Sequence, residues 1–67
     1  MKVKLFGFQD FCAKYDSGIY GKMTKGQAFY DYFFQRVTTD KHRQLCHVVY
    51  EVPDTEFDKF ISENFIV

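Results

Sequence analysis

The chain has no tryptophan, one proline, four glycines and only two cysteines among its 67 residues. Low proline and glycine content and the lack of low-complexity segments argue against a disordered chain. One cysteine pair, Cys12 and Cys46, in a chain without a secretion signal is more typical of two reduced thiols than of a disulfide. No apolar run approaches the roughly 18 residues of a membrane span, and the apolar start is too short for a signal peptide. We therefore expect a cytoplasmic protein without a membrane partner.

The chain also lacks a net charge, because nine basic residues balance nine acidic ones. Their distribution is uneven: residues 1–50 carry eight Lys and Arg against four acids, and residues 51–67 carry five acids against one Lys. The two parts therefore differ in sign, at +4 and −4. Overall neutrality disfavours a polyanion mimic and a dedicated nucleic-acid binder, since both need a field of one sign. A local basic patch stays open.

Aromatic residues are what the chain has in abundance, with nine Phe and five Tyr making up 21% of the sequence. A chain of this length forms one domain, over residues 1–67, and buries only roughly 60% of its unfolded surface. Each buried ring removes about 150–250 Å² from water, so a thin core of rings can still be stable. The composition predicts a single small globular domain.

Local signals predict four short helices, over 7–15, 25–37, 40–50 and 55–64. The second starts with a capping box, Thr24 to Gln27, and Thr39-Asp40 marks the start of the third. The fourth follows Pro53, with Asp54 or Thr55 as its cap. These signals favour an all-α fold, a compact domain of three to four short helices.

A competing α+β interpretation stays open at two segments. Residues 1–6 alternate briefly in polarity, and residues 46–52 alternate and are rich in β-branched side chains. Strands near 1–6 and 46–52 would then pair. Read instead as a helix, the second segment has an apolar face made of Leu45, Val48, Val49 and Val52.

The segment GQAFYDYFF, residues 26–34, contains five rings in its last six positions. On a helix Phe29, Tyr32 and Phe33 share one side, whereas Tyr30 and Phe34 form an i, i+4 pair on another. A thin domain cannot easily bury both groups. The second pair is therefore either additional core or a surface cluster of the residue types that dominate interface hot spots.

Catalytic and metal sites are weakly indicated. His42 and Cys46 stand at i, i+4 with Cys12 as a remote third ligand, but zinc needs four ligands in paired short spacings, and a surface histidine beside a small buried thiol is the simpler expectation. A nucleophilic pair of Cys12 or Cys46 with His47 would need a cleft and an orienting group. We expect no enzyme, no cofactor and no metal site.

Nucleic-acid binding is an alternative carried by basic residues beside aromatic ones. Such pairs can hold phosphates and stack bases, but no long basic helix is present and the C-terminal acids would repel a phosphate backbone. The residues concerned are Lys22, Lys25, Lys41 and Arg43.

Three motifs follow one another along the chain: an early FxxFC segment at residues 8–12, a GQxFxxxF element at 26–33, and a Pro-acid-aromatic segment leading into a Phe-rich end at 53–65. Their order resembles that in a group of small bacteriophage and prophage proteins. The resemblance implies a phage origin and no particular activity. Small phage proteins that fold alone commonly bind a host protein, for instance as host-takeover factors or as inhibitors of CRISPR and other defence systems.

The sequence thus favours a binding module acting in the host cytoplasm, which docks on a host protein and inhibits or redirects it. Its expected anchors are Tyr20, Tyr30, Phe34 and Arg36. Two alternatives remain at this stage: a small nucleic-acid-binding transcriptional regulator, and a homodimer or larger homo-oligomer whose exposed rings bury each other.

Overall fold

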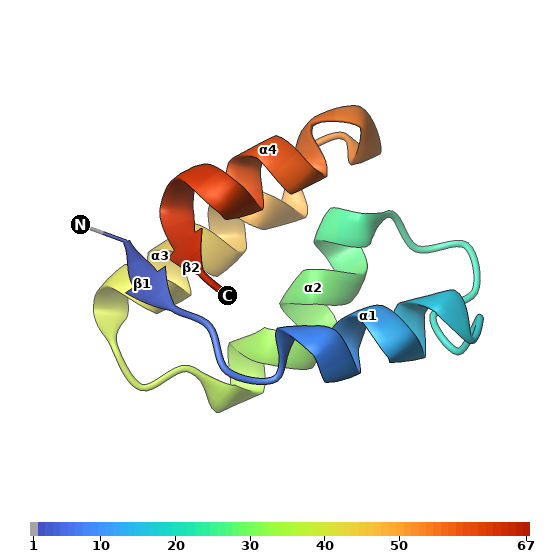
Figure 1. The fold of residues 1–67 in the computed structure, drawn as a ribbon, viewed down its shortest axis with the longest axis horizontal. Helices are drawn as coiled ribbons and strands as arrows, with labels where there is room; N and C mark the ends of the chain where they lie inside the picture. The colour runs from blue at the N-terminus through green and yellow to red at the C-terminus, as the bar shows by residue number, and fades with distance from the viewer. Residues whose placement is uncertain (1) are drawn as a thin grey trace.

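The computed structural model describes residues 2–67 and confirms a small all-α domain (Figure 1). In chain order the described elements are β1 (Val3–Lys4), α1 (Phe8–Asp16), α2 (Lys25–Phe33), the 3₁₀ turn η1 (Phe34–Arg36), α3 (Asp40–Tyr50), α4 (Asp54–Asn64) and β2 (Phe65–Ile66). The four predicted helices all exist, with bounds shifted by a few residues at most.

The competing strand pair is wrong. Residues 46–50 belong to α3, where Cys46 and Val49 are both fully buried at helical spacing, so packing overrides the β preference of the branched side chains. A strand does form near the N-terminus, but it pairs in parallel with β2, Val3 lying opposite Phe65. Parallel strands need a long crossover connection, and here all four α-helices supply it.

Side-chain caps begin α2 and α3 as predicted. At α2 the Gln27 amide donates to Thr24 Oγ1 at 3.1 Å, and the Thr24 amide donates to Gln27 Oε1 at 3.3 Å, which completes the capping box. At α3 the His42 amide donates to Thr39 Oγ1 at 3.2 Å. Both caps satisfy amides that have no partner inside the helix.

The predicted extension of α2 to residue 37 is wrong. The α-helix ends at Phe33, the 3₁₀ turn follows, and Val37 is extended. The Arg36 side chain donates to the carbonyl oxygen of Tyr32, one of the last carbonyls that the helix leaves without an internal partner. A tightened final turn is a common way to end a helix.

Asp54 and Thr55 do not cap α4, contrary to expectation. The N-cap of α4 is Pro53 and it has no side-chain cap. Asp54 Oδ1 instead accepts the amide of Lys25 at 2.8 Å, so an acid at the start of α4 caps the start of α2.

The buried face of α3 also differs from the predicted one. Val48 is 50% exposed, whereas His42, Cys46 and Val49 are buried. The buried face of α3 therefore includes a histidine, which a search for apolar residues alone does not find. His42 was expected at the surface, and this expectation is wrong.

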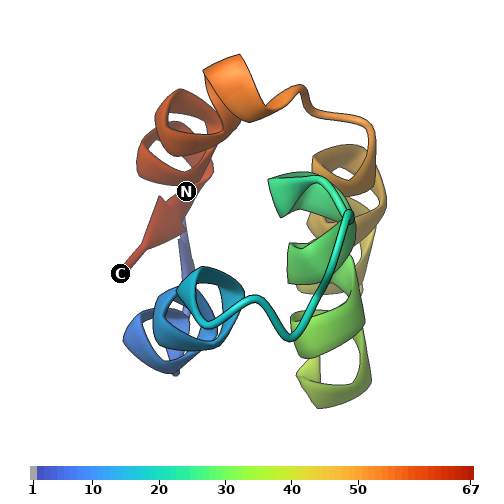
Figure 2. The same cartoon turned by 90° about the vertical axis from the view of Figure 1, so that its right-hand side faces the viewer.

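Helices α2 and α3 form a tightly packed hairpin on one side of the domain, and α1 and α4 form the other (Figure 2). Gly26, at the start of α2, lies against the end of α3. A Cβ added at Gly26 would stand 2.1 Å from the carbonyl oxygen of Val49, so only glycine permits this approach.

The core is built from rings. Phe11 of α1 packs against α2. Its ring centroid lies 5.7 Å from that of Phe29 and 5.8 Å from that of Phe33. Phe29, Phe33 and Tyr32 are all buried, as predicted. Most of these pairs are tilted or edge-on, the arrangements that ring quadrupoles favour.

Candidate functional site

Tyr30 and Phe34 lie outside the main core and stack on each other. Their ring centroids are 4.6 Å apart with an interplanar angle of 16°. Both side chains are partly buried, whereas Phe29 and Phe33 on the neighbouring face are at most 1% exposed. Helical geometry separates these two pairs, because residues four apart lie on one face and the second pair is offset from the first by one residue.

Helix α3 adds two further rings to this pair. The centroid of Tyr30 lies 5.4 Å from that of His47 and 5.4 Å from that of Tyr50, and Phe34 lies 5.3 Å from His47. His47 and Tyr50 are exposed. We call the four side chains Tyr30, Phe34, His47 and Tyr50 the aromatic surface.

A shallow open hollow of about 480 Å³ adjoins the aromatic surface, lined by Tyr30, His47, Tyr50 and Glu51. Tyr30 and Tyr50 meet edge to face, at 79°. Rings beside a carboxylate suit an apolar side chain or a cation, since ring faces attract positive charge. The chemistry of the hollow therefore suits an apolar or positively charged group.

Tyr20 and Arg36, the other two predicted anchors, lie elsewhere. Tyr20 is partly buried against α1, 6.0 Å from Phe11 and stacked on Tyr15 at 6.3 Å, and burial raises its pKa. Arg36 lies over the ring of Tyr32 at 4.2 Å and donates to the Tyr32 carbonyl. Tyr20 thus fixes the loop after α1 against that helix, and Arg36 contacts the end of its own helix, α2.

The ring of Tyr32 also ties α2 to α1 through a polar cluster. Its hydroxyl donates to Asp10 Oδ2 at 2.6 Å, and Lys14 Nζ lies 3.3 Å from the same oxygen. The Tyr32 hydrogen bond, followed by Lys14, lowers the pKa of Asp10, and the same bond raises the pKa of Tyr32. The cluster is explained by helix packing.

His47 and Tyr50 were not predicted as partner-binding residues. Their spacing, i and i+3, places them on one face of α3, and that signal was present in the sequence. What joins them to Tyr30 and Phe34 is the packing of α2 on α3, which no local pattern specifies.

The basic residues of the nucleic-acid alternative fall into two separate pairs. Lys25 begins α2 beside the end of α3, as the contact of Gly26 with Val49 shows, and Lys22 precedes it by three residues. The other two, Lys41 and Arg43, are exposed at the opposite end, the start of α3, where Arg43 pairs with Asp40 at 3.0 Å. The pairs therefore lie at opposite ends of the α2–α3 hairpin.

The cysteines are free and at least partly buried. Cys46 is fully buried, and burial raises its pKa to about 11, which makes its thiolate scarce at neutral pH. His47 is exposed on a different side of α3. Across residues 2–67 no three His, Cys, Asp or Glu side chains are grouped so as to hold a metal ion.

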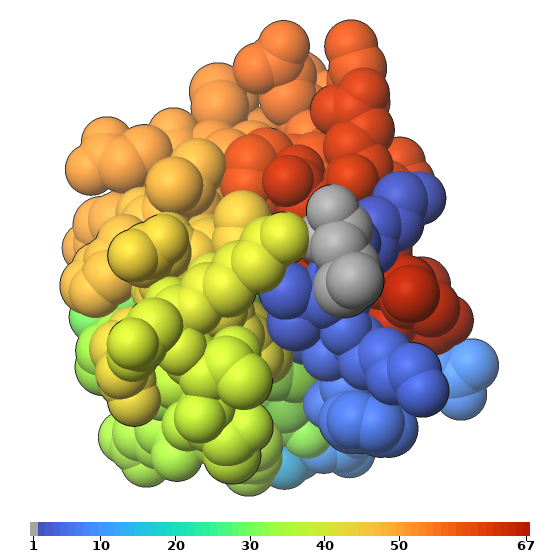
Figure 3. All heavy atoms as spheres, turned by 90° about the vertical axis from the view of Figure 1, so that its left-hand side faces the viewer, coloured from blue at the N-terminus to red at the C-terminus, as the bar shows by residue number. Residues whose placement is uncertain are grey.

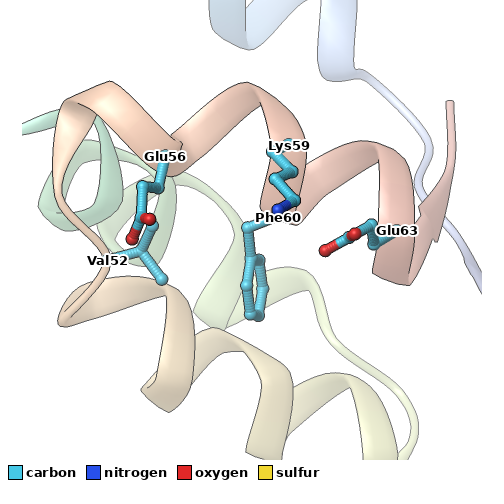
Figure 4. A pocket seen from close by; sticks show the side chains of 5 residues that line it. All are labelled: Val52, Glu56, Lys59, Phe60 and Glu63. Carbon is cyan, nitrogen blue, oxygen red and sulfur yellow. The ribbon is translucent and has the colours of Figure 1, made fainter.

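A smaller hollow, of about 160 Å³, adjoins α4. Figure 4 shows the ring of Phe60 reaching toward α3, with Lys59 and two acids around it; its lining residues are Val52, Glu56, Lys59, Phe60 and Glu63. This volume is below the roughly 300 Å³ at which small-molecule pockets usually begin. Within the same described range, no helix is long and apolar enough to cross a membrane.

Fold and site together define a small all-α domain with a ring cluster on its surface. No family model, curated protein or solved structure compared with this chain matches it. The function proposed below therefore rests on the residues of this chain.

Proposed function

We propose that this protein is a binding module that docks on another protein through the aromatic surface. The observation that carries the proposal is the stacked pair of Tyr30 and Phe34, partly buried outside the main core and extended by the exposed His47 and Tyr50. Tyrosine is among the residue types most enriched at interface hot spots, because its ring buries a large area while its hydroxyl stays hydrogen-bonded.

The size of the molecule suits such a role. Its accessible surface is 4661 Å². A standard interface covers about 800 Å² on each partner, roughly a sixth of this surface.

A bacterial host protein is the partner that the resemblance to phage proteins suggests. The module would inhibit or redirect that protein, as host-takeover and anti-defence proteins do. Uneven charge supports a steered encounter: the acids of residues 51–67 lie mainly on α4, and the basic excess lies on the other elements.

Removing one exposed ring tests the proposal. Tyr50→Ala takes away a side chain that is 44% exposed, so the fold should survive while binding weakens by about 30-fold or more, as expected for a hot-spot residue. A partner captured from bacterial lysate would be purified, and its dissociation constant measured by calorimetry for both forms.

Ile19→Ser is the matched control, because Ile19 is a 64% exposed apolar side chain outside the aromatic surface. Equal affinity of Tyr50→Ala and the unchanged protein would contradict the proposal, as would a control that weakens binding equally. A dimeric mass that becomes monomeric in Tyr50→Ala would favour the homodimer instead. Loss of helical circular dichroism in Tyr30→Ala/Phe34→Ala would assign that pair to the core.

A further inference from the structure

A second cleft, which shares no lining residue with the aromatic surface, lies between the N-terminal strand and the segment that joins α2 to α3. Its volume is about 480 Å³, within the range of small-molecule pockets. Figure 3 shows the two segments side by side on this face of the molecule, the N-terminal one in dark blue and the connecting one in yellow-green. The lining residues are Val3, Lys4, Phe6, Phe33, Arg36, Thr38, Thr39 and His42.

His42 is the unusual member of this lining. The residue is only 9% exposed, and its Nε2 is buried without a hydrogen-bond partner in the described part of the chain. Its ring lies 6.4 Å from Phe33 and 5.6 Å from Phe65, which leaves it among apolar neighbours. An unpaired buried polar atom destabilises the folded protein, so a ligand atom that forms a hydrogen bond with it removes this cost.

The charges around the cleft are of one sign. Lys4 and Arg36 line it, and the lining contains no Asp or Glu. Neither of these two cations belongs to an ion pair recorded within residues 2–67. Burial lowers the pKa of His42, so near neutral pH its ring is uncharged and offers either a donor or an acceptor at Nε2. The walls therefore favour an anion.

The apolar part of the lining favours an organic anion over an inorganic one. Val3, Phe33 and the 81% exposed ring of Phe6 give the cleft a hydrophobic wall. An inorganic anion would leave this wall in water, whereas an organic acid would cover it. Apolar walls with a few convergent polar groups are the usual composition of a small-molecule site.

We propose that this cleft binds a small organic carboxylate with an apolar body, such as an aromatic acid, whose carboxylate lies between Lys4 and Arg36 and accepts a hydrogen bond from His42 Nε2. Because Nε2 is fully buried in this structure, binding requires the His42 ring to turn toward the cleft. The body of the ligand lies against Val3 and Phe33. The site is separate from the aromatic surface, so it holds whether or not that surface binds a protein.

Nuclear magnetic resonance with benzoate as the probe tests the site. Benzoate should cause saturable shifts of the His42 ring signals and of the Thr38 and Thr39 amides at millimolar concentration. Benzyl alcohol, which keeps the ring without the charge, and inorganic phosphate, which keeps the charge without the ring, should each bind at least tenfold more weakly. Octanoate distinguishes an aromatic from an aliphatic preference.

Two variants assign the contacts. His42→Phe keeps a ring between Phe33 and Phe65 but removes Nε2, and should weaken benzoate binding about tenfold, the effect expected from losing one charge-assisted hydrogen bond. Lys4→Gln, at an exposed position, should weaken it severalfold without affecting folding. Lys22→Gln removes a lysine outside the cleft and should change nothing.

Three outcomes would overturn the proposal. They are no saturable shift up to 50 times the concentration of the protein, equal binding of benzoate and phosphate, and equal binding by the protein and by both cleft variants. Tyr50→Ala, which disrupts the aromatic surface, should bind benzoate normally.

Discussion

At several positions the fold depends on one particular residue, and Gly26 is the clearest example. Its sequence context indicated only the first turn of a helix. In the structure it lies against the Val49 carbonyl with no room for a methyl group. His42 is comparable: its place between apolar neighbours in α3 follows from packing, since a histidine beside a lysine and an arginine gives no sign of burial.

Gly26→Ala is expected to lower the free energy of unfolding by at least about 2 kcal/mol, because the added methyl group meets a backbone carbonyl that side-chain motion cannot relieve. Chemical denaturation followed by circular dichroism measures it. Asp31→Ala, at an exposed position of the same helix, should change stability by about 0.5 kcal/mol or less. Helix propensity alone gives the opposite sign, stabilisation by about 1 kcal/mol, so a more stable Gly26→Ala protein would contradict the close approach.

At the scale of the elements, the helices are defined locally but tied together non-locally. Thr24 and Thr39 cap their own helices, and these caps were predictable from sequence. Asp54 caps a helix 29 residues away, and only the approach of α4 to α2 places it there. The two strands are likewise too short to be predicted as a pair, since two residues carry almost no periodicity.

Asp54→Ala is expected to destabilise the protein by about 1 kcal/mol and to speed hydrogen exchange at the Lys25 amide, which loses its acceptor. Glu56→Ala is the matched control, because it also removes an acid from the first turn of α4 but should leave the Lys25 amide protected. Asp54→Asn keeps an acceptor oxygen and should restore most of the protection. Equal exchange at Lys25 in Asp54→Ala and Glu56→Ala would refute the cross-helix cap.

At the scale of the whole molecule, the two short strands β1 and β2 come together beside His42. β1 pairs with β2, Phe65 of β2 packs on His42, and Lys4 and Arg36 line the adjoining cleft. Protonating His42 would place a charge among apolar rings. Global stability should therefore depend on this one group in mildly acidic solution.

The thermal midpoint is expected to fall by a few degrees as the pH drops from 7.5 to 5.5, since burial lowers the pKa of His42 in the folded protein. The unfolded chain then binds more protons below its ordinary histidine pKa of about 6.5, and stability is lost as the pH falls through that value. Asp10, whose pKa is lowered, would lose its contribution only at more acidic pH, below about 4.

His42→Phe should flatten this dependence between pH 7.5 and 5.5, as scanning calorimetry would show. His47→Gln, a change at the exposed histidine, should retain it. An unchanged slope in His42→Phe would mean that another group causes the loss of stability.

The sequence by itself determined the positions of the helices, their two threonine caps and the division of the rings in GQAFYDYFF, because each depends on residues within about one or two turns of one another. It favoured the all-α class but left strands near 1–6 and 46–52 open. Tertiary structure alone decided the burial of His42, the cap from Asp54, the joining of the chain ends and the addition of His47 and Tyr50 to the pair of Tyr30 and Phe34. The physical reason is that these contacts depend on how one helix lies against another, and in a core this thin the position of a single glycine sets that distance.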